Sequence, residues 1–535
     1  MSTRGLFRRR GVVLAAAIGS GAVLLAACSS SSKSSSTSTS KTPGPTTLHL
    51  AFESDMGQPP DPDIFYELEG NAVTTTVYEG LVRYEPDINQ IEPALATSWD
   101  TSPDGLTYTF HLRSGVSFHD GTPMDSAAVK TSFMRRTAVN SAPAYMLGDV
   151  DHYETPDPST FVVKLKDPVN PFLDYLAAPY GPKVLSPAVL AAHAGTDNAQ
   201  SWLKDHDAGT GPFTISSFVP GQKYTLTRDD QYWGGKPYLS EIDIAIVPDI
   251  STQRLELEGG QLDMILHGLS TEDVNALKSN AKFEVHQFPA NLKTLLFVNE
   301  NKGIFKDPGV RTALRSAIDK KAIVASVYGS RATVSTQTIP TGELPEGMAA
   351  DAPAFDPSKL AAAVKNLPDK KVDLAYDTQD ATNQRVANLI QTQMQAAGLN
   401  VTVRGVTFSQ AQDLPNHPDQ APDALLDSTN PDASHPDTWV RIYNHTNDGT
   451  NGALNFLKCS VPAADAAMDK GVHATSNADM QSLYSQAGGL IGDSGCFDTI
   501  ADVKETVVAR TGYAGYVHQL PTLFTIRFGD LKAAS

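Results

Sequence analysis

The sequence predicts an α/β protein with two lobes, and two observations carry this prediction. Residues 370–406 follow a strand, helix, strand pattern: KKVDLAYD, an amphipathic segment from Asn383 to Gly398, and LNVTVRGV. A unit of this kind places its two strands in parallel, joined by a crossover helix. The earlier part, from Leu48 onward, is instead rich in alternating strands and short turns. Two lobes of different character suggest a cleft between them, where small ligands usually bind.

The N-terminus has the pattern of an export signal. Arg4 and Arg8–Arg10 precede an apolar run from Gly11 to Ala27, which is too short for an ordinary membrane span. The run ends in Leu-Ala-Ala-Cys28, which resembles a bacterial lipobox, and we expect Cys28 to carry a lipid. The alternative is an ordinary signal peptide with a chance cysteine. We therefore expect a signal peptide at 1–27 and a Ser/Thr-rich tether at 28–47, too polar to fold.

Charge and cysteine content narrow the function. The formal net charge of −18 argues against nucleic acid as a partner, because nucleic-acid binding depends on basic groups that neutralise phosphates. The chain has 3 cysteines, and with Cys28 lipidated only Cys459 and Cys496 are left. An even pair outside the cytoplasm predicts a disulfide, whereas the alternative is two unrelated buried thiols.

The individual elements follow from local patterns. LTYTFHLR places Leu106, Tyr108, Phe110 and Leu112 on one face of a half-buried strand. FTISSFVPGQKYTLTRD predicts a hairpin around Pro220-Gly221, and IDIAIV predicts a further strand. A helix is expected from Pro308, with Asp307 as its N-cap and Gly329 as its end.

Several long segments resemble one family. Tyr78–Phe133 contains YEGLVRYEP and FHDGTPMDSAAVKTSF, and it is followed by Gly209–Phe213, by RDDQYWGGKPYLSEIDIAIVPD and by LLFVNENKGIFKDPGVRTALRSAIDKKAIV. These segments, in this order, closely resemble the family 5 extracellular solute-binding proteins, which serve oligopeptide, dipeptide and nickel ABC importers.

The resemblance implies a bilobal fold like that of periplasmic binding proteins, with two α/β lobes, a hinge and a small inserted α+β domain. Lobe one would comprise 48–77, 205–299 and 497–535; the inserted domain would be 78–204; lobe two would be 300–496. The chain would cross between the lobes near Asn299 and Phe497. Ligand contact with both lobes would favour a closed form that docks on the permease.

The resemblance also implies ligand-binding residues. Family members commonly bind the peptide α-ammonium with an acid in a D-x-x-x-P-x-x-[FW] motif, which Asp432, Pro436 and Trp439 match here. A carboxylate in a closed cleft binds an ammonium through a charge-assisted hydrogen bond. Asp423 and Asp427 remain alternatives for the acid. Glu53 and Asp55 lie in the loop after the first strand, which lines the cleft in the family, although a solvent-exposed turn would explain them as well.

The predicted function is that of a lipid-anchored receptor on the extracytoplasmic face of the cell membrane. It would be a monomer that captures peptides and delivers them to an ABC permease, with no catalysis, no cofactor and no resident metal. A metal chelate or an oligosaccharide remains the alternative ligand.

Overall fold

The structure is a computed structural model that describes residues 46–340, 342–344, 348, 353–378, 380–447 and 452–534. Cys28 and nearly all of the predicted tether lie outside these residues. Among the described residues, no helix combines the length and apolar character needed to cross a membrane. The described part contains α-helices and several β-sheets, in agreement with the predicted α/β class.

The first lobe is built on a four-stranded sheet in which β1 pairs in parallel with β10 and the other neighbours are antiparallel. The predicted hairpin around Pro220-Gly221 is confirmed as β8 and β9. The elements of this region are β1 (Thr47–Phe52), α1 (Asn71–Val77), β8 (Phe213–Val219), β9 (Lys223–Arg228), β10 (Glu241–Ile246), α6 (Ile250–Gly259), β11 (Met264–Ile265), α7 (Thr271–Lys278), β18 (Tyr513–Ala514) and β19 (Lys532–Ala533).

The inserted region carries its own antiparallel sheet in the order β4-β5-β7-β6, together with the separate pair β2-β3. The predicted strand at LTYTFHLR is confirmed as β5, whose Tyr108, Phe110 and Leu112 are buried. Its elements are β2 (Val82–Tyr84), β3 (Ile91–Pro93), β4 (Ala96–Thr101), β5 (Thr107–Leu112), α2 (Ser126–Val139), a 3-10 helix (Ala142–Leu147), β6 (Val150–Asp157), β7 (Thr160–Leu165), α3 (Phe172–Ala177), α4 (Pro187–His193) and α5 (Gln200–Leu203).

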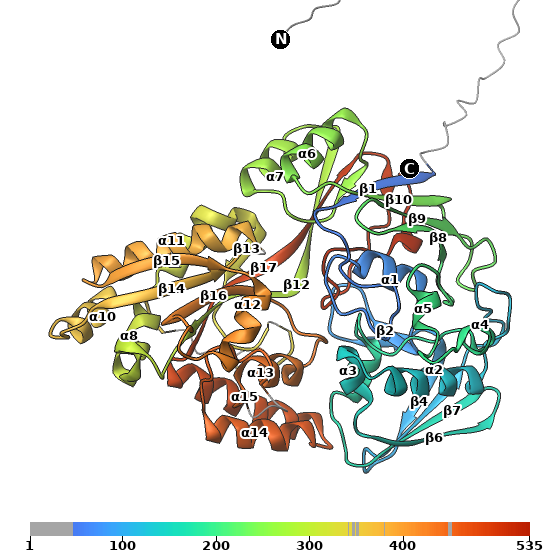
Figure 1. Ribbon diagram of the computed structural model, residues 1–535, viewed down its shortest axis with the longest axis horizontal. Coiled ribbons are helices and arrows are strands. Elements are labelled where there is room, and N and C mark those ends of the chain that lie inside the picture. The colour runs from blue at the N-terminus through green and yellow to red at the C-terminus, as the bar shows by residue number, and fades with distance from the viewer. Residues whose placement is uncertain are drawn as a thin grey trace, which may run out of the picture. The chain divides into compact units, whose positions relative to one another are not determined.

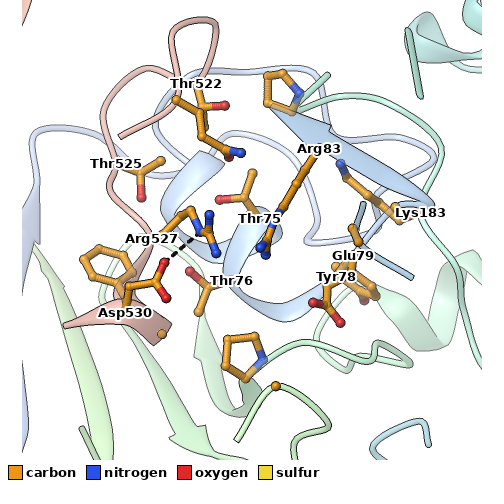
Figure 2. Close-up of a pocket in the computed structure, with 18 of the residues that line it drawn as sticks. Thr75, Thr76, Tyr78, Glu79, Arg83, Lys183, Thr522, Thr525, Arg527 and Asp530 are labelled. Atoms are coloured by element: carbon orange, nitrogen blue, oxygen red, sulfur yellow. Dashed lines mark ion pairs between the residues drawn. The ribbon is translucent and has the colours of Figure 1, made fainter. Parts of the chain in front are cut away.

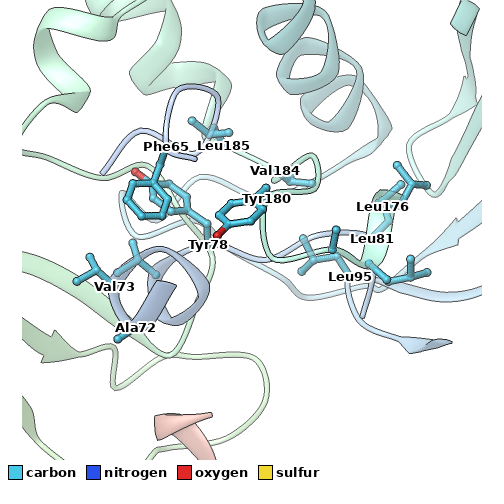
Figure 3. Packing of buried hydrophobic residues seen from close by; sticks show 14 of the residues in the cluster. Phe65, Ala72, Val73, Tyr78, Leu81, Leu95, Leu176, Tyr180, Val184 and Leu185 are labelled. Carbon is cyan, nitrogen blue, oxygen red and sulfur yellow. The ribbon is translucent and has the colours of Figure 1, made fainter. Parts of the chain in front are cut away.

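One continuous hydrophobic core joins the first lobe to the inserted region. Figure 3 shows Ala72 and Val73 of α1, Tyr78 just beyond it, and Leu81 and Leu95 of the inserted region in this core, together with Tyr180 and Val184. The insertion is therefore packed firmly onto lobe one.

The second lobe is an α/β layer structure whose sheet is covered on both faces. Leu296, Leu374 and Leu426 face the core beneath α8, α10 and α11, whereas Leu295, Ala375 and Leu425 face the core beneath α13, α14 and α15. The predicted strand–helix–strand unit is confirmed, with β14 parallel to β15. The elements are α8 (Pro308–Ala317), α9 (Lys320–Ile323), β13 (Ala332–Val334), α10 (Pro357–Val364), β14 (Lys371–Asp377), α11 (Ala381–Ala396), β15 (Asn400–Val406), α12 (Phe408–Asp413), β16 (Ala424–Thr429), α13 (Pro436–Asn444), α14 (Pro462–Val472) and α15 (Asn477–Ser494).

The helix predicted from Pro308 to Gly329 is wrong in its extent. Asp307 caps it as expected, accepting a hydrogen bond from the amide of Gly309 at 2.8 Å. The α-helix ends at Ala317, because Ile318 adopts an extended conformation. Asp319 then caps a new short helix, α9, by accepting a hydrogen bond from Ala322 N at 2.9 Å.

Two long strands, β12 (Phe283–Val298) and β17 (Phe497–Arg510), join the lobes and pair with each other in antiparallel orientation. At one end β17 pairs with β11, and at the other end β12 pairs with β16; Figure 1 labels β12, β16 and β17. Their pairing is interrupted between Phe288 and Leu292, where three residues of β12 face Lys504 alone. A bulge of this kind bends and twists a strand pair. The lobe boundaries predicted at Asn299 and Phe497 stay a prediction, and this bulge is a second candidate for the hinge.

Candidate functional site

Asp432 lies in the loop that connects β16 to α13 in lobe two. The loop is shaped by the start of the helix: Pro436 occupies the first turn, where its missing N–H costs nothing, and His435 Nδ1 accepts a hydrogen bond from Asp437 N at 3.1 Å. The proline of the sequence motif thus starts the helix that follows Asp432, and the acid is placed just before it.

The Asp432 carboxylate is bound by two tyrosines from outside lobe two. Tyr145, in the 3-10 helix of the inserted region, donates a hydrogen bond to Asp432 Oδ2 at 2.6 Å, and Tyr66, in the loop after β1, donates to the same oxygen. Tyr66 packs against Tyr180, with ring centroids 4.8 Å apart, and Tyr145 packs edge-on against Tyr175 at 5.6 Å. Asp432 therefore lies where three regions of the chain meet.

Asp432 is a buried carboxylate without a cationic partner. Its residue is only 9% exposed, and burial raises the pKa of the carboxyl, while the Tyr145 and Tyr66 hydroxyls act in the opposite direction. In the described part of the chain no lysine, arginine or histidine forms an ion pair with it, and no hydrogen bond reaches Oδ1. Asp437 on the same segment differs, because Arg441 Nε pairs with it at 2.9 Å. Asp432 therefore retains capacity for a cationic ligand group.

Further contacts surround the loop and connect it to the inserted region. Ser434 N donates to Tyr84 OH at 3.0 Å, and His435 Nε2 donates to Asn170 Oδ1 at 2.9 Å. Asn291, in the bulge of β12, donates through Nδ2 to Ser434 Oγ at 2.7 Å. The loop that carries Asp432 is thus held both by the inserted region and by the strand that connects the lobes.

Trp439 is a core residue in this structure. It is fully buried on α13, and its ring lies 5.0 Å from that of Tyr443 in the core on that face of the lobe-two sheet. It supports the helix that follows Asp432, and a direct contact between Trp439 and ligand stays a prediction.

The two residues predicted in the loop after the first strand have different surroundings. Asp55 accepts hydrogen bonds from Gly221 N at 2.6 Å and from Tyr224 OH, so its carboxylate stabilises the β8–β9 turn. Glu53 lies 3.4 Å from His267 Nδ1, and Glu69 lies 3.2 Å from the other ring nitrogen. Burial alone lowers the pKa of His267, but these carboxylates and Glu505 raise it to about 9. Ligand contact by Glu53 or Asp55 stays a prediction.

The alternative acids lie beneath the loop on β16 or just before it. Asp423 accepts a hydrogen bond from Asp373 N at 2.7 Å. Asp427 is buried, which raises its pKa well above the ordinary value, and its Oδ2 has no hydrogen-bond partner among the described residues. Asp427 therefore remains an open alternative to Asp432.

The predicted disulfide is present: Cys459 and Cys496 are joined, with Cα atoms 6.2 Å apart. Cys496 lies between the end of α15 and the start of β17, so the bond attaches the loop before α14 to the beginning of a strand that links the lobes.

Residues 90–451 match the model described as "Bacterial extracellular solute-binding proteins, family 5 Middle". The chain is 28% identical over 469 residues to a probable D,D-dipeptide-binding periplasmic protein, DdpA, of Escherichia coli, a match that covers 84% of this chain and 89% of that protein.

Two solved structures share the fold. The ABC transporter-associated periplasmic binding protein DppA of Helicobacter pylori, in complex with the peptide STSA, superposes with a TM-score of 0.77 at 23% identity, covering 92% of this chain and 98% of that one. NikA of Brucella suis, in complex with Fe(III)-EDTA, superposes with a TM-score of 0.80 at 22% identity, covering 91% and 100%.

Proposed function

Because the chain belongs to the family 5 bacterial extracellular solute-binding proteins, we propose that it captures peptides between its lobes and delivers them to an ABC permease. Members of this family are extracytoplasmic receptors of ABC transporters and are not enzymes. Lipid attachment at Cys28 would hold this receptor on the outer face of the cell membrane. The receptor would act as a monomer.

The observation that carries the peptide proposal is the environment of Asp432. Burial of a carboxylate without a cationic partner costs free energy, and an ammonium group at Oδ1 of Asp432 would offset that cost. Tyr66 and Tyr145 come from the side opposite lobe two, so a ligand bound at Asp432 would contact both sides and favour the closed form. The likeness to a probable D,D-dipeptide-binding protein agrees with a ligand that carries an α-ammonium.

A metal chelate is the second candidate, because the similar NikA structure contains Fe(III)-EDTA. The described residues offer little support for direct metal ligation. Their one close group of metal-binding side chains is Glu300, Cys459 and Cys496, and its two sulfurs are joined in the disulfide. An oligosaccharide would use Asp432 only as a hydrogen-bond acceptor and would leave its charge without a partner.

Native mass spectrometry of the purified protein under gentle conditions tests the proposal. We expect adducts whose masses, after release and sequencing, correspond to peptides with free N-termini. Adducts that contain a transition metal with an organic chelator, or a series of hexose masses, would contradict the peptide assignment and favour the corresponding alternative.

A further inference from the structure

A cavity of about 280 Å³ lies within the first lobe and the inserted region, and Asp432 is not among the residues that line it. Its walls come from the end of α1, from β2, from the segment around Lys183, from the loop after β9 and from the C-terminal segment 519–530. None of the residues that line it belongs to 300–496. A ligand here would not bridge the two lobes, so this cavity is distinct from the proposed peptide site.

Two arginines dominate one wall of the cavity. Arg83 projects from β2 and Arg527 from the C-terminal segment, and Figure 2 shows their guanidinium ends directed toward each other, with Thr75 and Thr76 on either side. Both share one acceptor, because Glu92 Oε1 accepts from Arg83 Nε at 2.7 Å and from Arg527 Nη1 at 3.4 Å. Arg527 Nε also pairs with Asp530 at 2.9 Å.

The two guanidinium groups repel each other and retain unused donors. Burial and the charge of Arg83 both lower the pKa of Arg527. A guanidinium has five N–H donors. Within the described chain no hydrogen bond or ion pair reaches the terminal nitrogens of Arg83 or Nη2 of Arg527. An anion between the two groups would accept these donors and reduce the repulsion.

Three other charged groups line the cavity, Glu79, Lys183 and Asp530, and the Asp530 carboxylate already pairs with Arg527 Nε. Glu79 is already satisfied by Trp233 Nε1 at 2.8 Å, Tyr232 OH at 2.8 Å and Thr210 Oγ1 at 2.9 Å, so it fixes the wall and has little capacity for a ligand cation. Lys183 donates to Ala178 O at 3.0 Å. The free groups facing the cavity are therefore mainly donors, which favours an acceptor ligand.

The size and polarity of the cavity further restrict the class of ligand that it can bind. A volume of about 280 Å³ exceeds that of a simple inorganic oxyanion and is close to the lower range of small-molecule pockets. Thr522 and Thr525 line the wall beyond Arg527 and provide hydroxyl groups for a polar body. Arginine pairs are well suited to carboxylates, because the planar fork matches the two carboxylate oxygens.

We propose that this cavity binds a small organic carboxylate, with the carboxylate between Arg83 and Arg527 and the rest of the molecule toward Thr522 and Thr525. The bound molecule would join the first strand of the inserted region to the C-terminal segment. The proposed carboxylate site does not depend on the proposed peptide site, so each can be tested separately.

Calorimetric titration with succinate tests the proposal, at constant ionic strength and in a buffer free of carboxylates. We expect the unmodified protein to bind succinate, and Arg83→Gln and Arg527→Gln to bind it about tenfold more weakly or worse, since a hydrogen bond to a charged group is lost. Arg254→Gln is the matched control, because Arg254 lies on α6, pairs with two acids, Glu258 and Asp273, and does not line the cavity. Equal succinate affinity in all four proteins, absence of binding to the unmodified protein, or equal binding of sulfate would overturn the assignment.

Chemical protection of the unmodified protein gives a second readout that does not depend on folding of the variants. Phenylglyoxal modifies accessible arginines, and peptide mass spectrometry locates the adducts. Succinate should protect Arg83 and Arg527 and leave Arg254 as reactive as before, whereas methylammonium should protect none of them. Unchanged modification of Arg83 and Arg527 in succinate would refute the site.

Discussion

Replacement of Asp432 by asparagine keeps the shape of the side chain and removes its charge. In the structure both tyrosine hydroxyls donate to Oδ2, and the asparagine oxygen can still accept from them. The loop should therefore keep its position, because the Pro436 helix start and the Ser434–Tyr84 hydrogen bond do not involve the carboxylate. The variant thus isolates the charge that the proposed peptide ammonium would meet.

The expected size of the effect follows from burial. Removal of one partner from a buried ion pair typically costs about 3–5 kcal/mol, because the other charge is left without a partner. Asp432 is only 9% exposed, but its two tyrosine hydroxyls already disperse part of its charge. We therefore expect the lower end of that range, about 3 kcal/mol, which weakens peptide binding roughly a hundredfold.

The assay is calorimetric titration of the native and Asp432→Asn proteins with one peptide in its free and N-acetylated forms. Acetylation removes the ammonium, so it should weaken binding to the native protein and have little further effect on the variant. Asp427→Asn is the matched control, since Asp427 is a buried acid of the same lobe. Equal affinities in all combinations would refute the role of Asp432, and a loss only in Asp427→Asn would transfer that role to Asp427.

Three further predictions concern the disulfide, the anchor and pH. The Cys459–Cys496 bond closes a loop with a sequence separation of 37, so a double Cys→Ser variant should lose about 4 kcal/mol in urea unfolding and keep its peptide affinity; unchanged stability would contradict this. Cys28→Ser should release the protein from the membrane fraction, and continued incorporation of labelled palmitate would show that Cys28 is not the lipidated residue. The pKa of His267 is raised to about 9 from its ordinary 6.5, so its contribution to stability is complete below pH 6.5 and is lost as pH rises toward 9. Urea midpoints of the native protein should fall over this interval relative to His267→Gln, and parallel pH profiles would exclude the effect.

The sequence predicted elements well where the pattern was local. The alternation in β5, the Pro220-Gly221 hairpin and the Asp307-Pro308 helix start all depend on neighbouring residues, and the structure has each of them. The predicted end of that helix at Gly329 is wrong, because Asp319 lies inside the apolar pattern and caps a second helix. Helical periodicity alone does not show such an internal cap.

The surroundings of the candidate site were harder to predict. The D-x-x-x-P-x-x-W motif predicts a ligand-binding role for Asp432, but no sequence pattern indicates Tyr66 and Tyr145 as its hydrogen-bond donors. Tyr66 lies 366 positions away in an irregular loop, and Tyr145 lies 287 positions away in a short 3-10 helix. Their convergence depends on the packing of three regions, which propensity and periodicity do not describe.

The pairing of β12 with β17 has a mechanical consequence. Because the two connecting strands are hydrogen-bonded to each other, the lobes are linked by one ribbon and not by two independent tethers. Stretching or shearing a ribbon breaks its ladder hydrogen bonds, whereas twisting does not. Relative motion of the lobes would therefore proceed mainly by torsion of this ribbon, which is least constrained where Pro289–Asn291 face Lys504 alone. A substitution in this bulge would change the resistance of the ribbon to twisting, and because Asn291 donates to Ser434 in the Asp432 loop, it would also reach the candidate ligand site.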